Sequence, residues 1–425
     1  MNRDAIDVRL AYGSSGMAVR LPAAATTVIS PRPREAVQDE RATLLAAIES
    51  PVAGPRLRDI ARPGQRVAIS VCDVTRPQPR RVMLEALMEV LDGLIRPEDV
   101  VVLIATGTHR ASTTRERREM LGADVMETWR VVDHDARDPT GLVDLGYVDD
   151  VPVFLAREWI EADLRITTGF VEPHFFAGFS GGPKMVAPGL AGLETTLALH
   201  NARRIGDPRA TWGVIEGNPV HDAVRAITRA TRVDFSVDVL LDDRQRITRA
   251  FAGETLAMHA AACVAARREA MRSVPAPFDI VITTNSGYPL DQNLYQAVKG
   301  MSAAAEIVKP GGTIVCAAEC RDGLPNHGSY GQLLHAGRSP ADLLERIAGS
   351  RVTIPDQWQV QIQARVQMKA DVLVRCDGLT DAEVRAAHLA PIADVGEAVE
   401  RLLHNEPDAS ICVLPQGPQT IAYVA

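Results

Sequence analysis

"RVAISVCDVTRPQPRRVMLEALMEVLDGLIRPEDVVVLIATG", residues 66–107, places a helical pattern between two apolar runs. The runs at 66–73 and 101–107 are of strand type, because each is short and continuous and is followed by polar residues. Between them, apolar residues recur at helical spacing over 79–94. Unbroken apolar strands on either side of a helix are typical of a parallel sheet that is buried on both faces. This stretch therefore predicts an α/β fold with mostly parallel sheets.

The same pattern continues toward the carboxyl end of the chain. "LRITTG" at 164–169 predicts another strand, and "GLETTLALHNARRI" at 192–205 predicts a helix that carries His200. A hairpin is expected to turn at the aspartate pair 242–243, and a long alanine-rich helix follows it over 254–272. These elements extend the fold with further strands and helices.

A domain boundary is predicted at "SVPAPFD", residues 273–279, where two prolines interrupt the periodic pattern. Beyond it the alternation starts again, with "DIVITT" as a strand, "DQNLYQAVKGMSAAAEIV" as a helix and "TIVCAA" as a strand. We therefore expect two α/β domains, an N-terminal one over 1–272 and a smaller C-terminal one over 278–425. The active site is expected in the cleft between them.

The bulk composition excludes several classes of protein. The chain has 425 residues, of which 46% are hydrophobic, and its net charge of −8 is spread without long runs. This charge argues against nucleic acid or an anionic membrane as an electrostatic partner. No apolar stretch approaches the ~20 residues of a membrane-spanning helix, and the start lacks the apolar core of a signal peptide. Six scattered cysteines without a CxxC pair predict reduced thiols in a cytoplasmic protein.

Polar residues follow two of the predicted strands directly. "SVCDVTRP" brings Asp73, Thr75 and Arg76 to one strand end, and "TGTHR" brings His109 to another. Open α/β sheets bind ligands at this edge, and an arginine fork holds a carboxylate or phosphate through two hydrogen bonds. The alternatives are an Asp–Arg pair that closes a turn and a histidine that is an ordinary satisfied polar group.

A glycine-rich loop, "VEPHFFAGFSGGPKMVAPGL" at 171–190, holds Lys184 between His174 and His200. It is not a Walker A loop, because a proline precedes the lysine and a methionine follows it, and the dinucleotide fingerprint GxGxxG is absent as well. Such a lysine can form a Schiff base or a covalent tether, unless it is merely exposed on a tight turn.

The histidines around this lysine suggest further chemistry. His200 could be a metal ligand, but one protein nitrogen does not hold a transition metal tightly, so a cofactor would supply the other ligands. His174 and His109 could form a pair of bases, which a racemase needs because a proton is handled on either face of its substrate.

The predicted C-terminal domain contributes one more cluster. In "NLYQAVKG", residues 293–300, the helical spacing of Tyr295, Gln296 and Lys299 places them on one face. A phenol, an amide and an ammonium together suit a small hydroxy-carboxylate, and the alternative is an ordinary solvated helix face. Arg76 and Lys299 could hold a small anion from opposite domains, and closure of the cleft would exclude water.

Taken in order, these motifs resemble the nickel-dependent lactate racemase family. The resemblance runs from about residue 10 to the end of the chain, and its most specific part is "EPHFFAGFSGGPKMVAPG", residues 172–189. The family's cofactor is a nickel-pincer nucleotide, pyridinium-3,5-bisthiocarboxylic acid mononucleotide, whose sulfur and carbon atoms grip nickel. The resemblance implies that Lys184 tethers this cofactor through a thioamide and that His200 is the fourth nickel ligand. The glycines would let the flat cofactor approach the backbone.

The same resemblance implies roles for the remaining candidates. His109 and His174 would be the two acid/bases, and Phe175 and Phe176 beside His174 would shape the pocket. The segment after the first strand would line the cofactor, and residues of both domains would bind the substrate. The cofactor-lining residues implied are Asp73, Val74, Thr75 and Arg76, and the substrate-binding residues implied are Arg76, Tyr295, Gln296 and Lys299.

The expected function is that of a racemase or epimerase of a small 2-hydroxy acid, lactate or a related acid. The family's chemistry is reversible hydride transfer from C2 of the substrate to the cofactor, and its partners include cofactor-synthesis and nickel-insertion proteins. A nicotinamide-dependent 2-hydroxy-acid dehydrogenase is an alternative, which the missing GxGxxG disfavours. A non-catalytic nucleotide or metal-binding protein is another.

Overall fold

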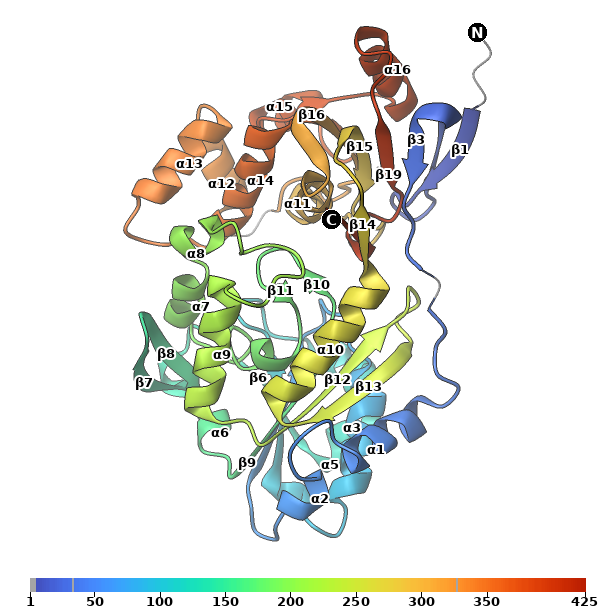
Figure 1. The fold of residues 1–425 in the computed structure, drawn as a ribbon. Helices are drawn as coiled ribbons and strands as arrows, with labels where there is room; N and C mark the ends of the chain where they lie inside the picture. The colour runs from blue at the N-terminus through green and yellow to red at the C-terminus, as the bar shows by residue number, and fades with distance from the viewer. Residues whose placement is uncertain (1–4, 33, 326–327) are drawn as a thin grey trace. The chain divides into compact units, whose positions relative to one another are not determined.

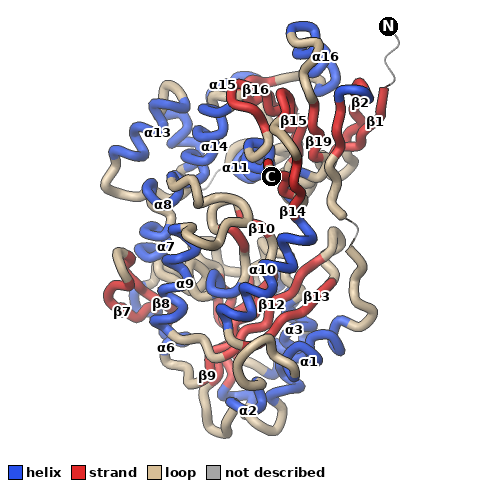
Figure 2. The backbone as a smooth tube through the Cα atoms, viewed as in Figure 1, coloured by secondary structure: helices blue, strands red, loops and turns tan. Residues whose placement is uncertain are grey.

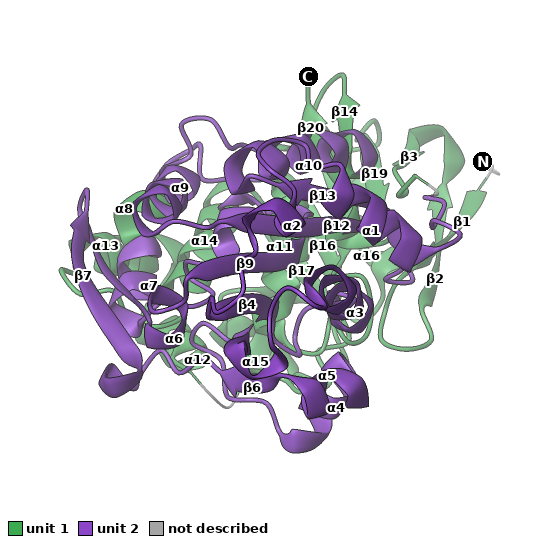
Figure 3. Cartoon of the chain, turned by 90° about the horizontal axis from the view of Figure 1, so that it is seen from below, with its two compact units in different colours: residues 1–32, 201–206, 270–425 green, residues 33–200, 207–269 purple. Residues whose placement is uncertain are grey.

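Two compact units make up the chain in the computed structural model, which describes residues 5–32, 34–325 and 328–425. Figure 3 colours them separately. We call residues 33–200 with 207–269 the N-terminal unit. The C-terminal unit comprises residues 1–32, 201–206 and 270–425.

This division differs from the predicted domains, 1–272 and 278–425, because early segments pack with late ones. Strand β3 (Thr26–Val28) pairs in parallel with β19 (Ile411–Leu414), which makes it an edge strand of the C-terminal sheet. The short helix α8 (Ala202–Gly206) packs on α14 (Gln357–Lys369).

The N-terminal unit is built on a six-stranded sheet in the order β13-β12-β9-β4-β5-β6 (Figure 1). Neighbouring strands from β12 to β6 run parallel, whereas β13 is antiparallel to β12. The strands are β4 (Val67–Cys72), β5 (Val100–Ala105), β6 (Arg130–Asp133), β9 (Leu164–Phe170), β12 (Phe235–Leu241) and β13 (Ile247–Gly253). The three predicted strands and the predicted hairpin of this unit are confirmed.

Both faces of this sheet are buried, as the unbroken apolar runs predict. Along β4, Val67 and Ile69 belong to one apolar cluster, and Ala68 between them belongs to another on the opposite face. The first cluster packs under α1 (Glu40–Glu49) and α3 (Arg80–Leu91). The other face is covered by α6 (Arg157–Ile160), α7 (Leu193–Leu199), α9 (Pro219–Thr231) and the hairpin of β7 (Leu142–Val148) and β8 (Val151–Ala156).

The C-terminal unit holds a second six-stranded sheet, in the order β18-β17-β16-β15-β19-β3, with all neighbours parallel (Figure 2). Its other strands are β15 (Phe278–Thr284), β16 (Val308–Ala317), β17 (Asp371–Arg375) and β18 (Ala390–Pro391). Helix α11 (Leu294–Ala305) packs on β15 and β16, and α14 packs on β16 and β17. The hairpin of β1 (Ala5–Leu10) and β2 (Met17–Pro22) shares an apolar cluster with α16 (Val395–Asn405).

The remaining elements are short or peripheral, except for the long α10. They are α2 (Leu57–Ile60), α4 (Thr114–Leu121), α5 (Ala123–Thr128), β10 (Pro173–His174), β11 (Gly178–Phe179), α10 (Thr255–Ala270), β14 (Met271–Val274), α12 (Tyr330–Ala336), α13 (Pro340–Gly349), α15 (Asp381–Ala386) and β20 (Ile421–Val424). Among the described residues, no helix combines the length and the apolar character needed to cross a membrane.

The single helix predicted over 192–205 is wrong in its continuity. Helix α7 ends at Leu199, His200 is its C-cap residue, and α8 begins at Ala202. The side chain of His200 bonds back to the carbonyl of Thr196 at 2.7 Å, as polar side chains near helix ends do. His200 therefore lies at a helix end rather than on a helix face.

Candidate functional site

The loops that follow three neighbouring parallel strands, β9, β4 and β5, carry the predicted residues of the N-terminal unit other than His200, which ends α7. Asp73 comes directly after β4, and His109 follows β5. The loop after β9 is tied to strand β4, where Ser70 Oγ donates to Met185 O at 3.2 Å, and to the loop after β5, where Gly107 N donates to Gly189 O at 3.0 Å. The predicted gathering of polar loops at one sheet edge is therefore observed.

His109 and Asp73 form a hydrogen-bonded pair, with Nδ1 2.8 Å from Oδ2. Burial raises the pKa of Asp73, but the hydrogen bond and charge of His109, with Arg76 and Thr75, outweigh it and lower this pKa below its ordinary value. An ionised carboxylate only accepts, so Nδ1 of His109 carries a proton, and in the neutral form of this imidazole Nε2 is bare. The imidazole is thus held in the tautomer of a base.

Arg76 is exposed at the turn that follows β4, as are Val74 and Thr75. The alternative of an Asp–Arg pair closing this turn is not what forms, because the Asp73 carboxylate pairs with His109 and accepts from Thr75 Oγ1 at 2.9 Å. The main chain closes the turn instead, through Arg76 N and Asp73 O at 3.2 Å. The arginine fork is left at the protein surface.

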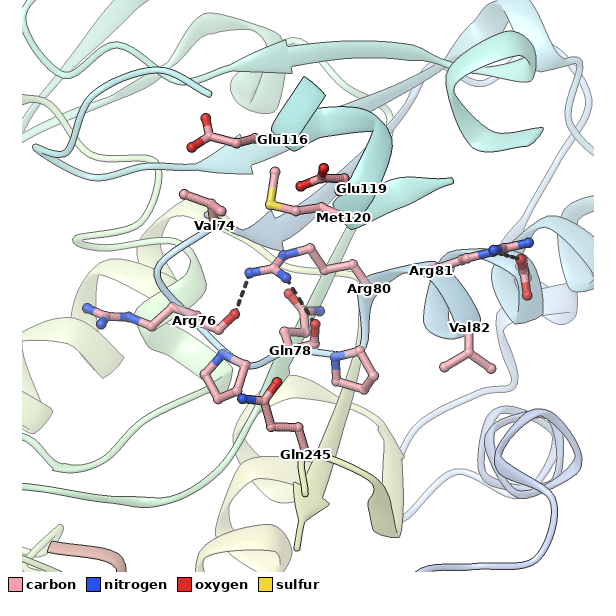
Figure 4. Close-up of a pocket in the computed structure, with 13 residues that line it drawn as sticks. Val74, Arg76, Gln78, Arg80, Arg81, Val82, Glu116, Glu119, Met120 and Gln245 are labelled. Atoms are coloured by element: carbon pink, nitrogen blue, oxygen red, sulfur yellow. Dashed lines mark hydrogen bonds and ion pairs between the residues drawn. The ribbon is translucent and has the colours of Figure 1, made fainter. Parts of the chain in front are cut away.

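Arg80 holds this turn through hydrogen bonds to its main-chain carbonyl groups, and the sequence analysis did not identify this residue. Its guanidinium donates to Cys72 O at 2.7 Å, Gln78 O at 3.0 Å and Arg76 O at 2.7 Å, and it also bonds Asp73 O. Figure 4 shows this guanidinium pointing into the loop. An arginine at a helix start usually belongs to the surface, so the sequence offered only a weak signal.

A cavity of about 480 Å³ opens beside the same loop (Figure 4). Its lining includes Arg76 and Gln78 from the loop and Glu116 and Glu119 from α4. Neither the predicted histidines nor Lys184 are among its lining residues. The cavity therefore adjoins the candidate site through Arg76 and is not the place where the predicted residues meet.

Phe176 is the point around which three predicted residues gather. Its ring contacts the ring of His174 edge-on at 4.5 Å between centroids, and that of His200 edge-on at 5.2 Å. The Lys184 ammonium lies 5.8 Å from the same ring centroid, within the range of a cation–π interaction. The sequence named Phe176 as a pocket-shaping residue, and its role as the shared contact of these three emerges from the fold.

His200 is buried and held in a form suited to metal binding. Its Nδ1 donates to the Thr196 carbonyl, which leaves Nε2 unprotonated. Burial lowers its pKa to about 4, the Thr196 bond opposes this shift and the charge of Lys184 adds to it. At neutral pH the side chain is thus a neutral imidazole, the form that ligates metals.

The donor set around His200 fits a metal whose other ligands come from elsewhere. Among the described residues, no group of three or more histidine, cysteine, aspartate or glutamate side chains is arranged to hold a metal ion. A single imidazole is a weak site for a transition metal by itself. These residues therefore fit a cofactor that brings its own ligands to the metal.

Lys184 lies in a short 3₁₀ turn (Gly182–Met185), and Gly181 directly before the turn and Gly182 at its start approach the protein closely. A Cβ on Gly181 would come within 2.7 Å of Asp238 Oδ2, and one on Gly182 within 2.5 Å of the His259 ring. Both glycines also have positive φ, 73° and 48°. We expected these glycines to admit a flat cofactor, and the contact that requires them here is with the protein underneath.

Tyr295, Gln296 and Lys299 lie on α11 and are partly exposed, as predicted for one helical face. Trp358 of α14 donates from Nε1 to the Tyr295 hydroxyl at 3.2 Å, a contact that the sequence reasoning missed. These residues belong to the C-terminal unit. Their meeting with Arg76 across a cleft stays a prediction.

Comparison with known families adds an independent line of evidence. Residues 12–213 match the family described as "Lactate racemase N-terminal domain", and residues 273–422 match "Lactate racemase C-terminal domain". A lactate racemase of Thermoanaerobacterium thermosaccharolyticum is 37% identical over 381 residues, 88% of each chain. One of Lactiplantibacillus plantarum is 35% identical over 382 residues, 89% of this chain and 90% of the relative.

Solved structures show the same likeness in three dimensions. The structure of the lactate racemase apoprotein from T. thermosaccharolyticum superposes with a TM-score of 0.91 at 34% identity, covering 98% of this chain and 100% of that one. A Thermotoga maritima protein shares the fold, with a TM-score of 0.66 at 17% identity over 91% of this chain and 97% of that one.

Proposed function

Because the chain belongs to the lactate racemase family and is an isomerase, we propose that it racemises a small 2-hydroxy acid, lactate or a close relative. The observation that carries this proposal is the pair of separately held imidazoles at one edge of the sheet. His109 is bound by Asp73 in the loop after β5, and His174 packs on Phe176 in the loop after β9. A reaction that inverts a carbon centre needs proton handling at two positions.

The cofactor of this proposal is the family's nickel-pincer nucleotide. Lys184 would be its tether, His200 would bind its nickel, and the segment of residues 73–76 would line it. When bound, the cofactor supplies an acceptor for the hydride at C2 of the substrate. The neutral, metal-ready imidazole of His200 and the nearness of Lys184 to the same phenylalanine support this assignment. The proteins that make this cofactor and insert nickel are its implied partners.

The hydrogen bonds of the two histidines suit different roles. Its bare Nε2 can take the hydroxyl proton of the substrate, and the Asp73 carboxylate stabilises the imidazolium that results. Nδ1 of His174 lies 3.3 Å from Ala177 N and 3.5 Å from Phe176 N. Both backbone amides donate, so Nδ1 of His174 accepts.

The substrate carboxylate would be held by cations. We assign Arg76 and Lys299 to it, with Tyr295 and Gln296 assisting. A guanidinium binds a carboxylate through two charge-assisted hydrogen bonds, which also orients C2 of the acid. The exposed side chain of Arg76 and the hydrogen bond that Trp358 donates to Tyr295 are compatible with this role.

The test is a screen of single enantiomers of 2-hydroxy acids with cofactor-loaded protein, followed by chiral chromatography. We expect the opposite enantiomer to accumulate to a near-equal mixture without any added nicotinamide. Formation of a 2-oxo acid in step with nicotinamide reduction would support the dehydrogenase instead. Absence of turnover on every acid by fully loaded protein would support a non-catalytic binding protein.

A further inference from the structure

Side chains of three elements form hydrogen bonds with the main chain of the loop that carries His174 and Lys184. Each bond is made to a different peptide group between Phe176 and Pro183. The bonds are Asn218 Nδ2 to Phe176 O at 3.0 Å, His221 Nδ1 to Ala177 O at 3.2 Å, His259 Nε2 to Ser180 O at 2.8 Å, Gly182 N to Asp238 Oδ2 at 2.7 Å and Thr228 Oγ1, which also donates to Val224 O at 3.0 Å, to Pro183 O at 3.4 Å. We call these five side chains the loop clamp.

The loop clamp is fully enclosed by the protein. Its five side chains are between 0% and 3% exposed, and they come from β12 and from the start or interior of α9 and α10. Burying a polar group costs free energy unless it is hydrogen-bonded. Five buried polar groups that hydrogen-bond to one short loop therefore indicate that the position of its backbone is specifically held.

The histidines of the loop clamp act as neutral donors. A carbonyl can only accept, so His221 carries its proton on Nδ1 and His259 on Nε2. Their rings stack at 5.5 Å between centroids. Burial, with the charges of His259 and Arg225 and a smaller effect of Lys184, lowers the pKa of His221 to about 3. Burial, with the charges of Lys184 and Arg225, lowers the pKa of His259 to about 4. The ammonium thus lies near two rings that stay uncharged.

Asp238 holds the most constrained point of the loop. It lies on β12 opposite Gly169 of β9, and its Oδ2 accepts the Gly182 N–H two residues before Lys184. A Cβ on Gly181 or Gly169 would come within 2.7 Å and 2.8 Å of this carboxyl group. Asp238 therefore fixes the distance between the Lys184 turn and the sheet.

We propose that the loop clamp is a set of positioning residues that fixes the Lys184 turn and the Phe176 ring for the reaction, an inference that rests on the proposed function. Asn218 holds the peptide of Phe176, whose ring contacts His174, Lys184 and His200. Asp238 and His259 hold the peptides on either side of Gly181. A shift of the loop would displace the acid/base and the cofactor tether together.

The first experiment measures backbone amide exchange over residues 176–190 in cofactor-free protein, by mass spectrometry. Asp238→Ala should raise exchange in this segment about tenfold or more, because the Gly182 amide loses its acceptor. Asp238→Asn should restore slow exchange, since an amide oxygen can accept the same N–H. Ser236→Ala is the matched control. Ser236 is equally buried on β12 and bonds Thr167 and Thr255 instead of the loop.

The second experiment measures kcat and KM per loaded enzyme. A misplaced reacting group costs on the order of 10²-fold, so kcat of Asp238→Ala should fall by about that factor with KM little changed. Asp238→Asn should recover most of this loss, and Ser236→Ala should match the wild type. A purely structural role would lower the stability of both alanine variants and leave kcat of the folded fraction intact.

The two experiments test the proposed function and the loop clamp independently of each other. If wild-type protein shows no racemisation, the proposed function is lost, and the exchange measurement still decides whether the loop clamp holds the loop. Equal exchange over 176–190 in Asp238→Ala and Ser236→Ala would overturn the inference. If Asp238→Ala does not fold, His259→Phe keeps an aromatic ring and removes the donor to Ser180 O, and unchanged exchange over 176–190 in that variant would overturn the inference as well.

Discussion

The hydrogen bond between His109 and Asp73 defines which imidazole nitrogen of His109 carries a proton. The buried carboxylate fixes the proton on Nδ1, which leaves Nε2 bare as a base. This arrangement explains why a histidine that is nearly half exposed can still have a defined tautomer. It also assigns to Asp73 an orienting role in addition to the cofactor lining that the sequence predicted.

Asp73→Asn tests this role with little change of shape. The asparagine amide would donate to Nδ1, so the proton of the imidazole would move to Nε2 and the base would be lost. We expect kcat to fall on the order of 10²–10⁴-fold in both directions of racemisation. Steady-state kinetics with a melting curve is the measurement. A folded, cofactor-loaded Asp73→Asn enzyme with near-native kcat would contradict the orienting role.

The residues that could be predicted are those that sequence proximity brings together. His174 and Lys184 are ten positions apart in one glycine-rich loop, and Asp73 and Arg76 share one turn. The residues that could not be predicted are joined only by the fold. Asp238 lies 56 positions from Gly182, and aspartate within a strand carries no motif.

At the scale of elements, strand ends were predictable and helix interruptions were not. Unbroken apolar runs identified β4, β5 and β9, and their parallel order brings the three functional loops to one edge. The break between α7 and α8 depends on a side-chain bond of His200 that no periodicity reveals. It changes the expected position of the candidate metal ligand from a helix face to a helix end.

Helix α14 shows a different limit of sequence periodicity. Its sequence "QWQVQIQARVQMK" alternates glutamine with apolar residues, a pattern closer to a strand than to an amphipathic helix. The glutamines are nevertheless buried in a helix because they find carbonyl partners. Gln361 donates to Ala202 O and Gln363 to Ala387 O, each at 2.8 Å. Such long-range partners satisfy the amide N–H groups of side chains that periodicity alone would place at the surface.

Arg80→Leu tests how the start of α3 supports the turn after β4. The change removes the hydrogen bonds from the guanidinium to the carbonyls of that turn, so Arg76 and Asp73 should lose their fixed positions. We expect KM to rise and kcat to fall together by tenfold or more, on the order of what small misplacement costs.

Arg81→Leu is the matched control for this prediction. Arg81 is its neighbour on α3, but its side chain is exposed and pairs only locally with Glu85, a contact of little worth. We expect near-native kinetics in this variant. Equal kinetic loss in both variants would show that the turn does not depend on Arg80.

At the scale of the whole molecule, the two units differ from simple sequence halves. Strand β3 and helix α8 belong to the C-terminal unit although they precede the end of the N-terminal one. A boundary based on prolines cannot detect such returns of the chain, because it records only where periodicity stops. The parallel α/β character of both units was predictable, since each relies on continuous apolar strands.

Buried neutral histidines should make the stability of the molecule depend on pH. The pKa of His259 is lowered to about 4, chiefly by burial, with Lys184 and Arg225 adding to the shift. Between about pH 6.5 and about pH 4, His259 is therefore protonated in the unfolded chain and neutral in the folded protein. Its contribution to folding stability is complete above that window and is lost as pH falls through it.

His259→Gln removes this linked proton and keeps a donor for the Ser180 carbonyl. Urea unfolding of cofactor-free protein at pH 7.5, 6 and 5 should show a smaller loss of stability on acidification in the variant than in the wild type. Asp238, whose pKa burial raises to about 7, acts in the opposite direction in both proteins, so the difference between them reports His259 together with its effect on the stacked His221. Parallel pH profiles would contradict a neutral, buried His259.

The central claim, racemisation through hydride transfer at this site, is tested most directly in deuterium oxide. Cofactor-loaded protein is incubated with one enantiomer of lactate, and the product is analysed for configuration and for deuterium at C2. A hydride that leaves C2 and returns on the other face does not exchange with water, so we expect a racemic product that retains protium at C2. Deuterium at C2 of the inverted product, or no inversion by fully loaded protein, would contradict the account.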